Sequence, residues 1–380
     1  MDLLLRYARQ KQGEIVALIR EFVECESPSD HPASVNRFTD LLAERVKDMA
    51  QVRTYAGGNA YGKHIRCEFA LPGAKKQGQI LALGHSDTVW PLGTLGTMPF
   101  RQSKGRLWGP GVFDMKGGLA FFIFAMRALW ELEVPVPRNV ILQVNSDEEI
   151  GSPSSRPLTE DAARESAAVL VLEPGTGLDG KLKTARKGVG DYTITVRGRA
   201  AHAGVDFSNG ASAILEMSRQ IEKIAGFTRL DRGITVSPGV IQGGTRSNVI
   251  PAECRAEIDV RIPRASGRAS LERRFASLKP FDKRCTIEVT GGMNRPPMER
   301  SAGTRALFRK AKSLAAQVGL SLEESSTGGG SDGNFTAALG VPTLDGLGAV
   351  GEGAHAANES ILINRIADRT ALLAKLVTAI

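Results

Sequence analysis

Three of the chain's five histidines stand in sequence settings that could serve chemistry. His85 lies in GHSDTV, His202 in AAHAG and His355 in GAHAANE. We expect His31 and His64 to be ordinary structural residues, because a lone histidine is more often a satisfied core or surface side chain than a ligand. His85 follows the apolar residues 80–83, and Asp87 comes two residues later. A metal-bound imidazole commonly donates its other ring N–H to a carboxylate, so this turn could supply both a ligand and its orienting partner.

Acidic residues occur at three further points where an apolar segment begins or ends. Asp114 lies in GPGVFDMKGG, before an apolar helix, where a carboxylate could bridge two cations; a simple N-cap would leave the glycines unexplained. Glu148 and Glu149 follow an apolar strand, and adjacent acids are costly to bring close unless cations or protons compensate them. One of them could coordinate a metal while the other accepts a proton from metal-bound water. Glu173 follows the next strand.

The combination of these residues predicts a metal centre. His85, Asp114, Glu149, Glu173 and His355 provide nitrogen and oxygen donors without a thiolate. Such a set suits two zinc-like ions about 3.5–4 Å apart that share a bridging carboxylate. We therefore expect two divalent metal ions per chain, Zn²⁺ first, with Co²⁺ or Mn²⁺ as alternatives.

The segments that carry these residues read as an α/β fold. The apolar runs Gln79–Gly84, Val140–Asn145 and Ala168–Leu172 read as strands, and each delivers a candidate ligand just past its carboxyl end, where open α/β sheets build their sites. Gly117–Trp130 reads as a crossover helix. Further helices are expected at Leu3–Val23, Val35–Lys47, Arg305–Val318 and from Asn364. We predict a mixed, mostly parallel sheet flanked by helices.

The middle of the chain has a different pattern. Asp191–Arg197 and Cys254–Ile262 alternate as half-buried strands do, Thr286–Thr290 is a further strand, and Ser212–Ile224 is helical. Residues 263–280 are polar and carry no motif. We predict a small inserted α+β domain over residues 187–292, with residues 1–186 and 293–380 forming the catalytic, metal-binding domain.

Composition excludes several classes of function. The formal charge is +8, yet only 6% of the residues are aromatic and no basic run alternates with aromatics, so we expect no nucleic-acid partner. The four cysteines show no C-x-x-C spacing and should be reduced. The apolar stretch Leu119–Trp130 is too short to span a membrane, and the first residues lack a secretory signal pattern. We expect a cytoplasmic protein without a membrane partner.

The motifs H-x-D-T-V, G-x-x-D-M-K-G-G, D-E-E-x-G-S, L-E-P, H-A-G, S-N-V-I-P and a late G-x-H occur in this order along the chain. Together they resemble the M20 family of metallopeptidases, and within it the glutamate carboxypeptidase (carboxypeptidase G2-like) group. The resemblance implies that His85, Asp114 and Glu173 hold one metal, and that Asp114, Glu149 and His355 hold the other. It further implies Glu148 as general base, Asp87 as partner of His85, and a cis peptide bond after Asp114.

The resemblance also implies roles for the inserted domain, as a lid that mediates homodimerisation. His202 would approach the oxyanion of the tetrahedral intermediate, from its own or the opposite subunit. Asn248, Arg261 and the backbone N–H groups of the run that includes Gly330 and Ser331 would bind a substrate carboxylate. Lys187 and Arg295, at the two hinges, could help in binding or be structural.

The function implied is hydrolysis of an amide bond beside a free carboxylate, in a short peptide or an N-acyl amino acid. Release of a C-terminal amino acid such as glutamate is the first expectation. The alternatives are deacylation of the acetylornithine deacetylase or succinyl-diaminopimelate desuccinylase type, dipeptidase action, and a non-catalytic binder on the same fold. Glu148 argues against a binder, which would have no use for a base beside a complete ligand set.

Overall fold

The computed structural model describes residues 2–380, which divide into two compact units. Unit 1 takes the chain up to Ala185 together with Arg300–Thr327 and Ser331–Ile380, and unit 2 comprises Arg186–Glu299 and Gly328–Gly330. The inserted segment therefore ends seven residues later than the expected boundary at residue 292. The reason is that its last strand continues to Arg295 and still pairs there with the first.

Unit 1 is built on a mixed sheet with the strand order β1-β2-β6-β3-β7-β14. The strands are β1 (Ala50–Tyr55), β2 (His64–Phe69), β3 (Gln79–His85), β6 (Asn139–Asn145), β7 (Ser166–Val171) and β14 (Thr343–Leu344). The pairs β6–β3, β3–β7 and β7–β14 are parallel, whereas β1 and β2 join antiparallel at one edge. This confirms the expected fold class. Strands β3 and β6 are buried along nearly their whole length, as in sheets covered on both faces.

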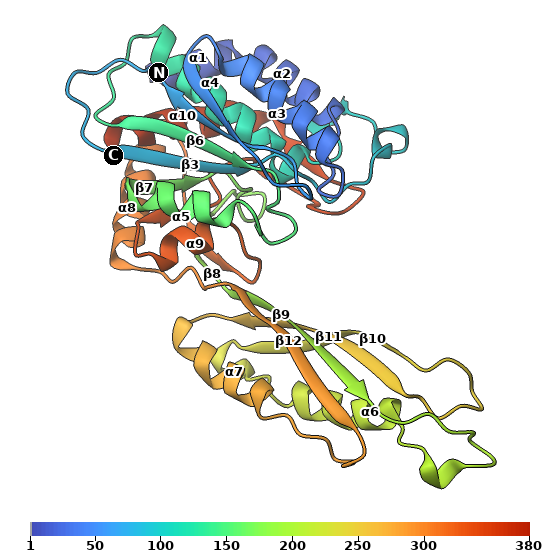
Figure 1. Ribbon diagram of the computed structural model, residues 1–380. Coiled ribbons are helices and arrows are strands. Elements are labelled where there is room, and N and C mark those ends of the chain that lie inside the picture. The colour runs from blue at the N-terminus through green and yellow to red at the C-terminus, as the bar shows by residue number, and fades with distance from the viewer. Residues whose placement is uncertain (1) are drawn as a thin grey trace. The chain divides into compact units, whose positions relative to one another are not determined.

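Helices cover both faces of this sheet (Figure 1). One face packs on α1 (Leu3–Gln10), α2 (Gln12–Glu24), α3 (Pro32–Val46), α4 (Gly117–Glu131), α8 (Ala302–Gln317) and α10 (Ile366–Ala379). The other face packs on α5 (Arg156–Arg164) and lies near α9 (Gly333–Ala338). Because side chains alternate along β3, Ile80 and Ala82 pack on the first of these faces, and Leu81 and Leu83 pack on the face that α5 covers. The expected first helix is in fact two, because the chain breaks at Lys11.

Short strands that the sequence did not predict complete unit 1. A small sheet has the order β15-β16-β5-β4, formed by β4 (Arg101–Ser103), β5 (Arg106–Trp108), β15 (Gly351–Glu352) and β16 (Ser360–Leu362). Strand β8 (Leu182–Arg186) pairs with β13 (Glu324–Thr327). Pairing of β16 with β5 brings the segment that contains His355 beside the glycine-rich loop that leads to Asp114.

Unit 2 is an antiparallel sheet with the order β10-β11-β9-β12 and helices on one face. Its elements are β9 (Gly188–Arg197), α6 (Ala213–Ala225), β10 (Thr235–Gly243), β11 (Glu253–Ile262), α7 (Arg268–Ala276) and β12 (Thr286–Arg295). The rings of Tyr192 and Phe275 stack at 3.9 Å in its core. Strand β10 was not predicted, and α7 lies in the polar stretch that carried no motif.

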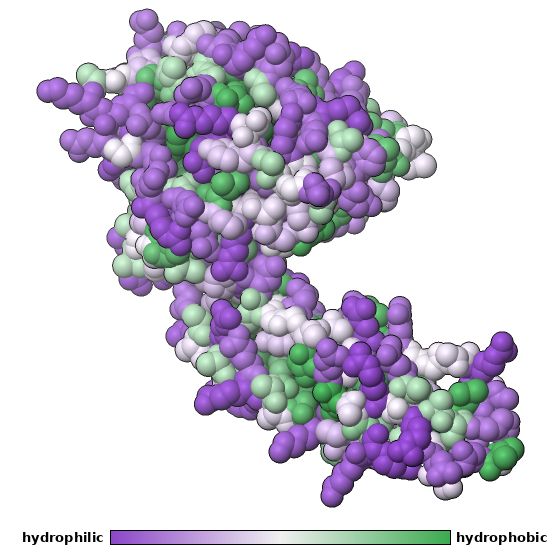
Figure 2. Space-filling model, in the orientation of Figure 1, coloured by the Kyte–Doolittle hydropathy of each residue, from purple (hydrophilic) through white to green (hydrophobic). Residues whose placement is uncertain are grey.

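Hydrophilic residues dominate the visible surface of both units (Figure 2). Among residues 2–380, no helix is both long and apolar enough to cross a membrane. All four cysteines are free, and Cys25 alone of them is not fully buried.

Candidate active site

The five predicted ligands meet at the carboxyl edge of the unit 1 sheet. His85 is the last residue of β3, Glu149 lies in the loop after β6, and Glu173 follows β7. Because these three strands are parallel neighbours, their carboxyl ends lie at one edge. Asp114 lies in the short helical turn η2 (Val112–Lys116), and His355 in the loop between β15 and β16.

Asp114 lies between the two histidines. His85 Nε2 is 3.2 Å from Asp114 Oδ1 and 3.4 Å from Glu173 Oε1. His355 Nε2 is 3.5 Å from the other oxygen of Asp114 and 3.3 Å from Glu149 Oε2. Each histidine therefore faces a different oxygen of the Asp114 carboxylate. The peptide bond between Asp114 and Met115 is cis, as the resemblance implies.

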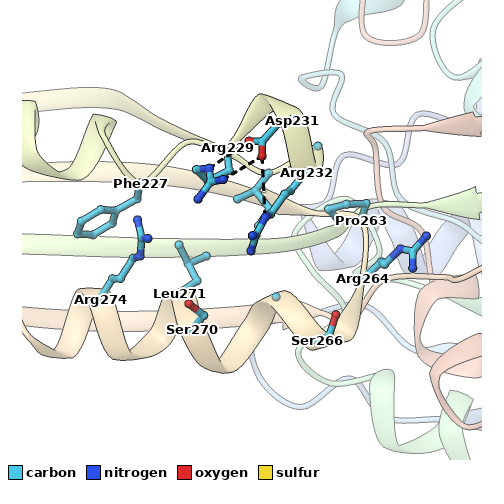
Figure 3. A pocket seen from close by; sticks show the side chains of 13 residues that line it. Phe227, Arg229, Asp231, Arg232, Pro263, Arg264, Ser266, Ser270, Leu271 and Arg274 are labelled. Carbon is cyan, nitrogen blue, oxygen red and sulfur yellow. Dashed lines mark hydrogen bonds and ion pairs between the residues drawn. The ribbon is translucent and has the colours of Figure 1, made fainter.

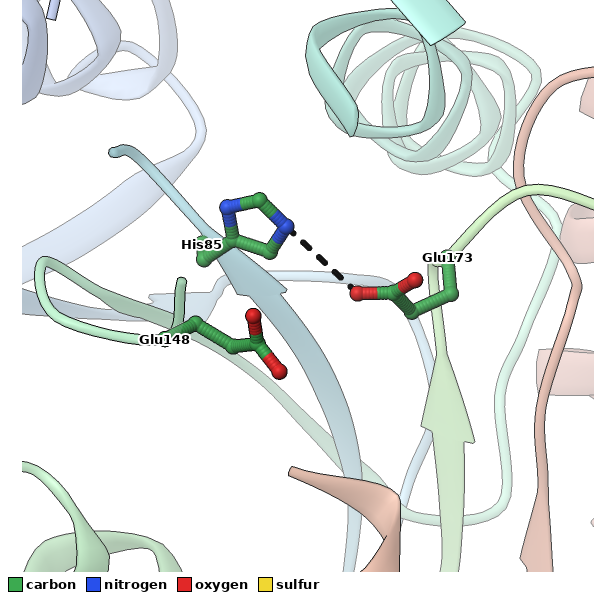
Figure 4. A group of neighbouring side chains, drawn as sticks. All are labelled: His85, Glu148 and Glu173. Atoms are coloured by element: carbon green, nitrogen blue, oxygen red, sulfur yellow. Dashed lines mark ion pairs between the residues drawn. The ribbon is translucent and has the colours of Figure 1, made fainter. Parts of the chain in front are cut away.

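The carboxylate of Glu148 also lies at the cluster. Ligand atoms of His85, Glu148 and Glu173 all lie within 4.8 Å of one another, and so do those of His85, Asp114 and Glu149. Figure 4 shows the side chains of His85, Glu148 and Glu173 converging on a common space. Geometry alone therefore allows Glu148 to coordinate, so a measurement must separate its role from that of Glu173.

Charge accumulates in this cluster, and the histidines compensate it. Burial raises the pKa of Glu149 to about 7. Hydrogen bonds to Asp114 and Glu149 raise the pKa of His355 to about 10. Burial opposes protonation of His85, but its contacts with Asp114, Asp87 and Glu173 outweigh burial and raise its pKa well above the usual value. Each of these shifts favours the protonated form, so cations would compete with protons for this cluster.

The residues present fit divalent cations. Glu149 Oε1 is buried and has no hydrogen-bond partner among the described residues, so one oxygen of this carboxylate lacks a donor. The donors are imidazole nitrogens and carboxylate oxygens, which zinc accepts at tetrahedral sites. A cation beside Glu149 would satisfy the orphaned oxygen and displace the proton that its raised pKa retains.

Asp87 holds the site together in a way that differs in part from the expected role. His85 Nδ1 lies 2.9 Å from the backbone carbonyl of Asp87 and 3.6 Å from its carboxylate. The carboxylate instead accepts hydrogen bonds from the backbone N–H groups of Glu148 and Glu149 and from the Ser29 hydroxyl. Asp87 therefore orients the imidazole mainly through its carbonyl, while its carboxylate fixes the loop that carries the two glutamates.

Sequence reasoning missed one residue at this site, Glu359. Its buried carboxylate accepts hydrogen bonds from the backbone N–H groups of Gly111, Phe113 and Asp114. The available signal was its place at the end of GAHAANE, four residues after His355. An isolated acid in a loop without periodicity gave no reason to single it out.

Two predicted lid residues are neighbours in unit 2. The N–H of Ala203 donates to the carbonyl of Asn248, and His202 forms a backbone bridge with Val249. His202 is exposed, and its Nδ1 accepts from the N–H groups of Gly204 and Val205 at 3.2 Å. These bonds assign the proton of a neutral ring to Nε2, which leaves a donor free to meet another group.

The other residues predicted to bind a carboxylate already have partners. Arg261, near the end of β11, donates to both oxygens of Asp259 and to the carbonyl of Gly328. Gly330 belongs to unit 2, and its carbonyl accepts from Arg186.

Ser331 belongs to unit 1 and is buried. Its N–H donates to Asn334 Oδ1 and its hydroxyl to Asp345, so neither group is free to bind a substrate carboxylate. Ser331 is therefore not among the residues that we propose for substrate binding. Lys187 lies between β8 and β9, and Arg295 is buried at the end of β12.

A cavity of about 620 Å³ lies in unit 2 and is lined by residues of that unit alone. Figure 3 shows that arginine side chains surround it. Its arginines are Arg229, Arg232, Arg264 and Arg274, and Asp231 is the one acid among its lining residues. Arg229 already forms a bidentate ion pair with Asp231. Without a second carboxylate or a histidine, this cavity cannot assemble a cluster of histidines and carboxylates like the one in unit 1.

Comparison with known proteins agrees with this geometry. Carboxypeptidase G2 of Pseudomonas sp. (strain RS-16) is 28% identical over 384 residues, covering 99% of this chain and 91% of the relative. A succinyl-diaminopimelate desuccinylase of Cereibacter sphaeroides is 29% identical over 74% of this chain and 78% of its own length. The crystal structure of aminopeptidase PepT from Bacillus cereus is similar in fold, with a TM-score of 0.78 at 23% identity, covering 97% of this chain and 98% of that one.

The sequence profile of peptidase family M20/M25/M40 matches residues 81–379, which is well over half of the chain and includes all five predicted ligands. The chain belongs to this family and is a hydrolytic enzyme of the metallopeptidase type.

Proposed function

We propose that this protein uses two divalent metal ions, zinc first, to hydrolyse an amide bond beside a free carboxylate. The observation that carries the proposal is the position of Asp114, whose two oxygens lie within 3.5 Å of the two histidines. His85, Asp114 and Glu173 would hold one ion, and Asp114, Glu149 and His355 the other. When bound, such a pair polarises a carbonyl and lowers the pKa of water.

Glu148 is the base in this proposal. Its backbone N–H donates to the Asp87 carboxylate at 3.2 Å, and a carboxylate oxygen of Glu148 lies within 4.8 Å of ligand atoms of His85 and Glu173. A carboxylate held there can take the proton of the attacking water and return it to the leaving amine. Glu149, next to it, is the ligand, because its Oε2 already lies 3.3 Å from His355.

His202 would stabilise the charge that develops on the carbonyl oxygen. Its Nδ1 accepts two backbone N–H groups, so Nε2 carries the proton and can donate to an oxyanion. The Ala203–Asn248 backbone hydrogen bond holds the segments of His202 and Asn248 side by side, and we propose Asn248 as a further donor to the substrate.

Arg261 would bind the substrate carboxylate, with Asn248 and the N–H of Gly330 as further donors. A guanidinium meets a carboxylate through two parallel hydrogen bonds. Asp259 now occupies part of that fork, so a substrate carboxylate would have to share or displace it. This competition lowers the contribution that we expect from Arg261.

The substrate class follows from the resemblance and the relatives. Likeness to carboxypeptidase G2 over 99% of the chain favours release of a C-terminal amino acid such as glutamate. The runner-up is removal of an acyl group from an amino acid, which the similar desuccinylase favours over 74% of the chain.

A homodimer through unit 2 is part of the proposal. Strand β10 is an edge strand, and it exposes Val240 and Ile241 by 44% and 52%. Ile214 and Leu215 at the start of α6 are also exposed, and α6 packs beside β10. An open edge with apolar side chains is a template for pairing with a second chain.

The test is a panel of N-acyl amino acids and dipeptides, assayed with zinc-loaded protein. We expect hydrolysis to be fastest for substrates with a C-terminal glutamate, to stop on chelation, and to return with Zn²⁺ or Co²⁺. Activity that survives exhaustive metal removal would refute the mechanism. A preference for succinylated or acetylated amines over peptides would favour the runner-up.

A further inference from the structure

Glu359 ends the loop between β15 and β16 and is completely buried. Its Oε2 accepts hydrogen bonds from Trp90 Nε1 at 2.7 Å and from the Gly111 N–H at 2.8 Å. Its Oε1 accepts from the N–H groups of Phe113 and Asp114 at 2.8 and 3.0 Å. Four donors thus surround one carboxylate.

These donors come from segments that carry different candidate ligands. Trp90 lies five residues after His85 on the same loop, and the backbone donors belong to the loop that presents Asp114. Glu359 itself lies four residues after His355. One buried carboxylate therefore ties together the loops of three candidate ligands, and Asp87 ties the loop of Glu148 and Glu149 to that of His85.

The glycine-rich loop needs this anchor. Gly111 has a φ of +71°, and a Cβ there would lie 2.8 Å from a methyl group of Thr88, so only glycine fits. Val112, Phe113 and Met115 of this loop pack in the core, but apolar packing does not satisfy backbone N–H groups. The N–H groups of this loop must be satisfied without water, and Glu359 satisfies three of them.

The four donors require an ionised carboxylate. Such a group only accepts hydrogen bonds and offers about four lone-pair sites, which matches four donors. A glutamine would keep one accepting oxygen but would present an NH₂ group to two of the N–H donors.

We propose that Glu359 is a positioning residue for the metal centre, which holds Asp114 where its two oxygens can face two cations. The inference rests on the proposed two-metal function. It predicts that the carboxylate of Glu359 determines metal affinity although the residue itself touches no metal. Partners that orient metal ligands commonly change metal affinity by about 10- to 100-fold when they are replaced.

The experiment compares Glu359→Gln with Glu216→Gln, a matched control in unit 2. Glu216 is also buried and accepts from the N–H groups of Phe281 and Asp282 and from Gln220. Zinc affinity is measured by competition with a chromogenic chelator, beside melting temperature and steady-state kinetics. We expect both variants to melt earlier, but only Glu359→Gln to bind zinc about 10- to 100-fold more weakly. At saturating zinc its kcat should fall while KM stays.

Wild-type affinity in Glu359→Gln, or an equal loss in Glu216→Gln, would overturn the inference. If Glu359→Gln does not fold, Trp90→Phe removes one donor and leaves the three backbone donors in place. It should weaken zinc binding severalfold, and unchanged affinity would overturn the inference. Failure of the wild-type protein to bind zinc would instead overturn the proposed function, so the two failures are distinguishable.

Discussion

Replacement of Glu148 by glutamine separates the proposed base from the ligands. The variant keeps the size of the side chain and the backbone N–H that binds Asp87, so the loop should keep its shape. It removes the group that accepts the proton. Turnover should fall by about 10²–10⁴, which corresponds to about 2.7–5.5 kcal/mol of activation free energy. The five proposed ligands are untouched, so two ions should remain bound.

Glu173→Gln is the matched variant, because Glu173 Oε1 lies 3.4 Å from His85 Nε2 and is proposed as a ligand. It should lose one of the two ions. Metal content is measured by mass spectrometry on desalted protein, with kinetics on the same samples. If Glu148→Gln loses an ion as Glu173→Gln does, Glu148 is a ligand, in keeping with its place in the cluster. Turnover near that of the wild type would remove Glu148 as base.

Three further predictions concern protons, substrate and assembly. The raised pKa values of His85, His355 and Glu149 favour the protonated forms of these groups in the metal-free cluster, so zinc must displace protons when it binds. Calorimetry in buffers of different ionisation enthalpy should detect the release of protons on zinc binding, and the affinity for zinc should fall from pH 8 to pH 6. Release of fewer than one proton per chain would contradict this prediction. Arg261→Ala should raise KM for carboxylate-bearing substrates, by a factor that corresponds to a loss of about 2 kcal/mol of binding free energy. This value is near the lower limit for a buried charge pair, because Arg261 is part-exposed and already paired with Asp259. An unchanged KM would exclude Arg261 from the substrate site. Ile241→Lys at the exposed edge of β10 should convert a dimer to a monomer in light scattering, whereas a wild-type monomer would refute assembly through this edge.

The sequence predicted the elements that have a continuous or periodic apolar signal. Strands β3, β6 and β7 are continuous apolar runs; His85 is the last residue of β3, Glu148 and Glu149 follow β6, and Glu173 follows β7. The parallel pairing of β3 with β6 agrees with the crossover helix α4 between them. Because each strand ends at the same edge, the convergence of ligands that are distant along the chain could be predicted from the sequence alone.

Other features had no periodic signal. Strands β15 and β16 have two and three residues, too few for alternation to appear, yet they place His355 and Glu359. Helix α7 is mostly polar, and only Leu271 and Phe275 of its residues are buried. The pairing of Arg261 with Asp259 could not be predicted either, because residues two apart in a strand share a face but need not touch.

A crystal structure of the zinc-loaded protein, with anomalous scattering recorded at the zinc edge, tests the central claim most directly. We predict two peaks about 3.5–4 Å apart, one bound by His85 and Glu173, the other by Glu149 and His355, with Asp114 between them. A single peak, or peaks away from these side chains, would contradict the two-metal mechanism.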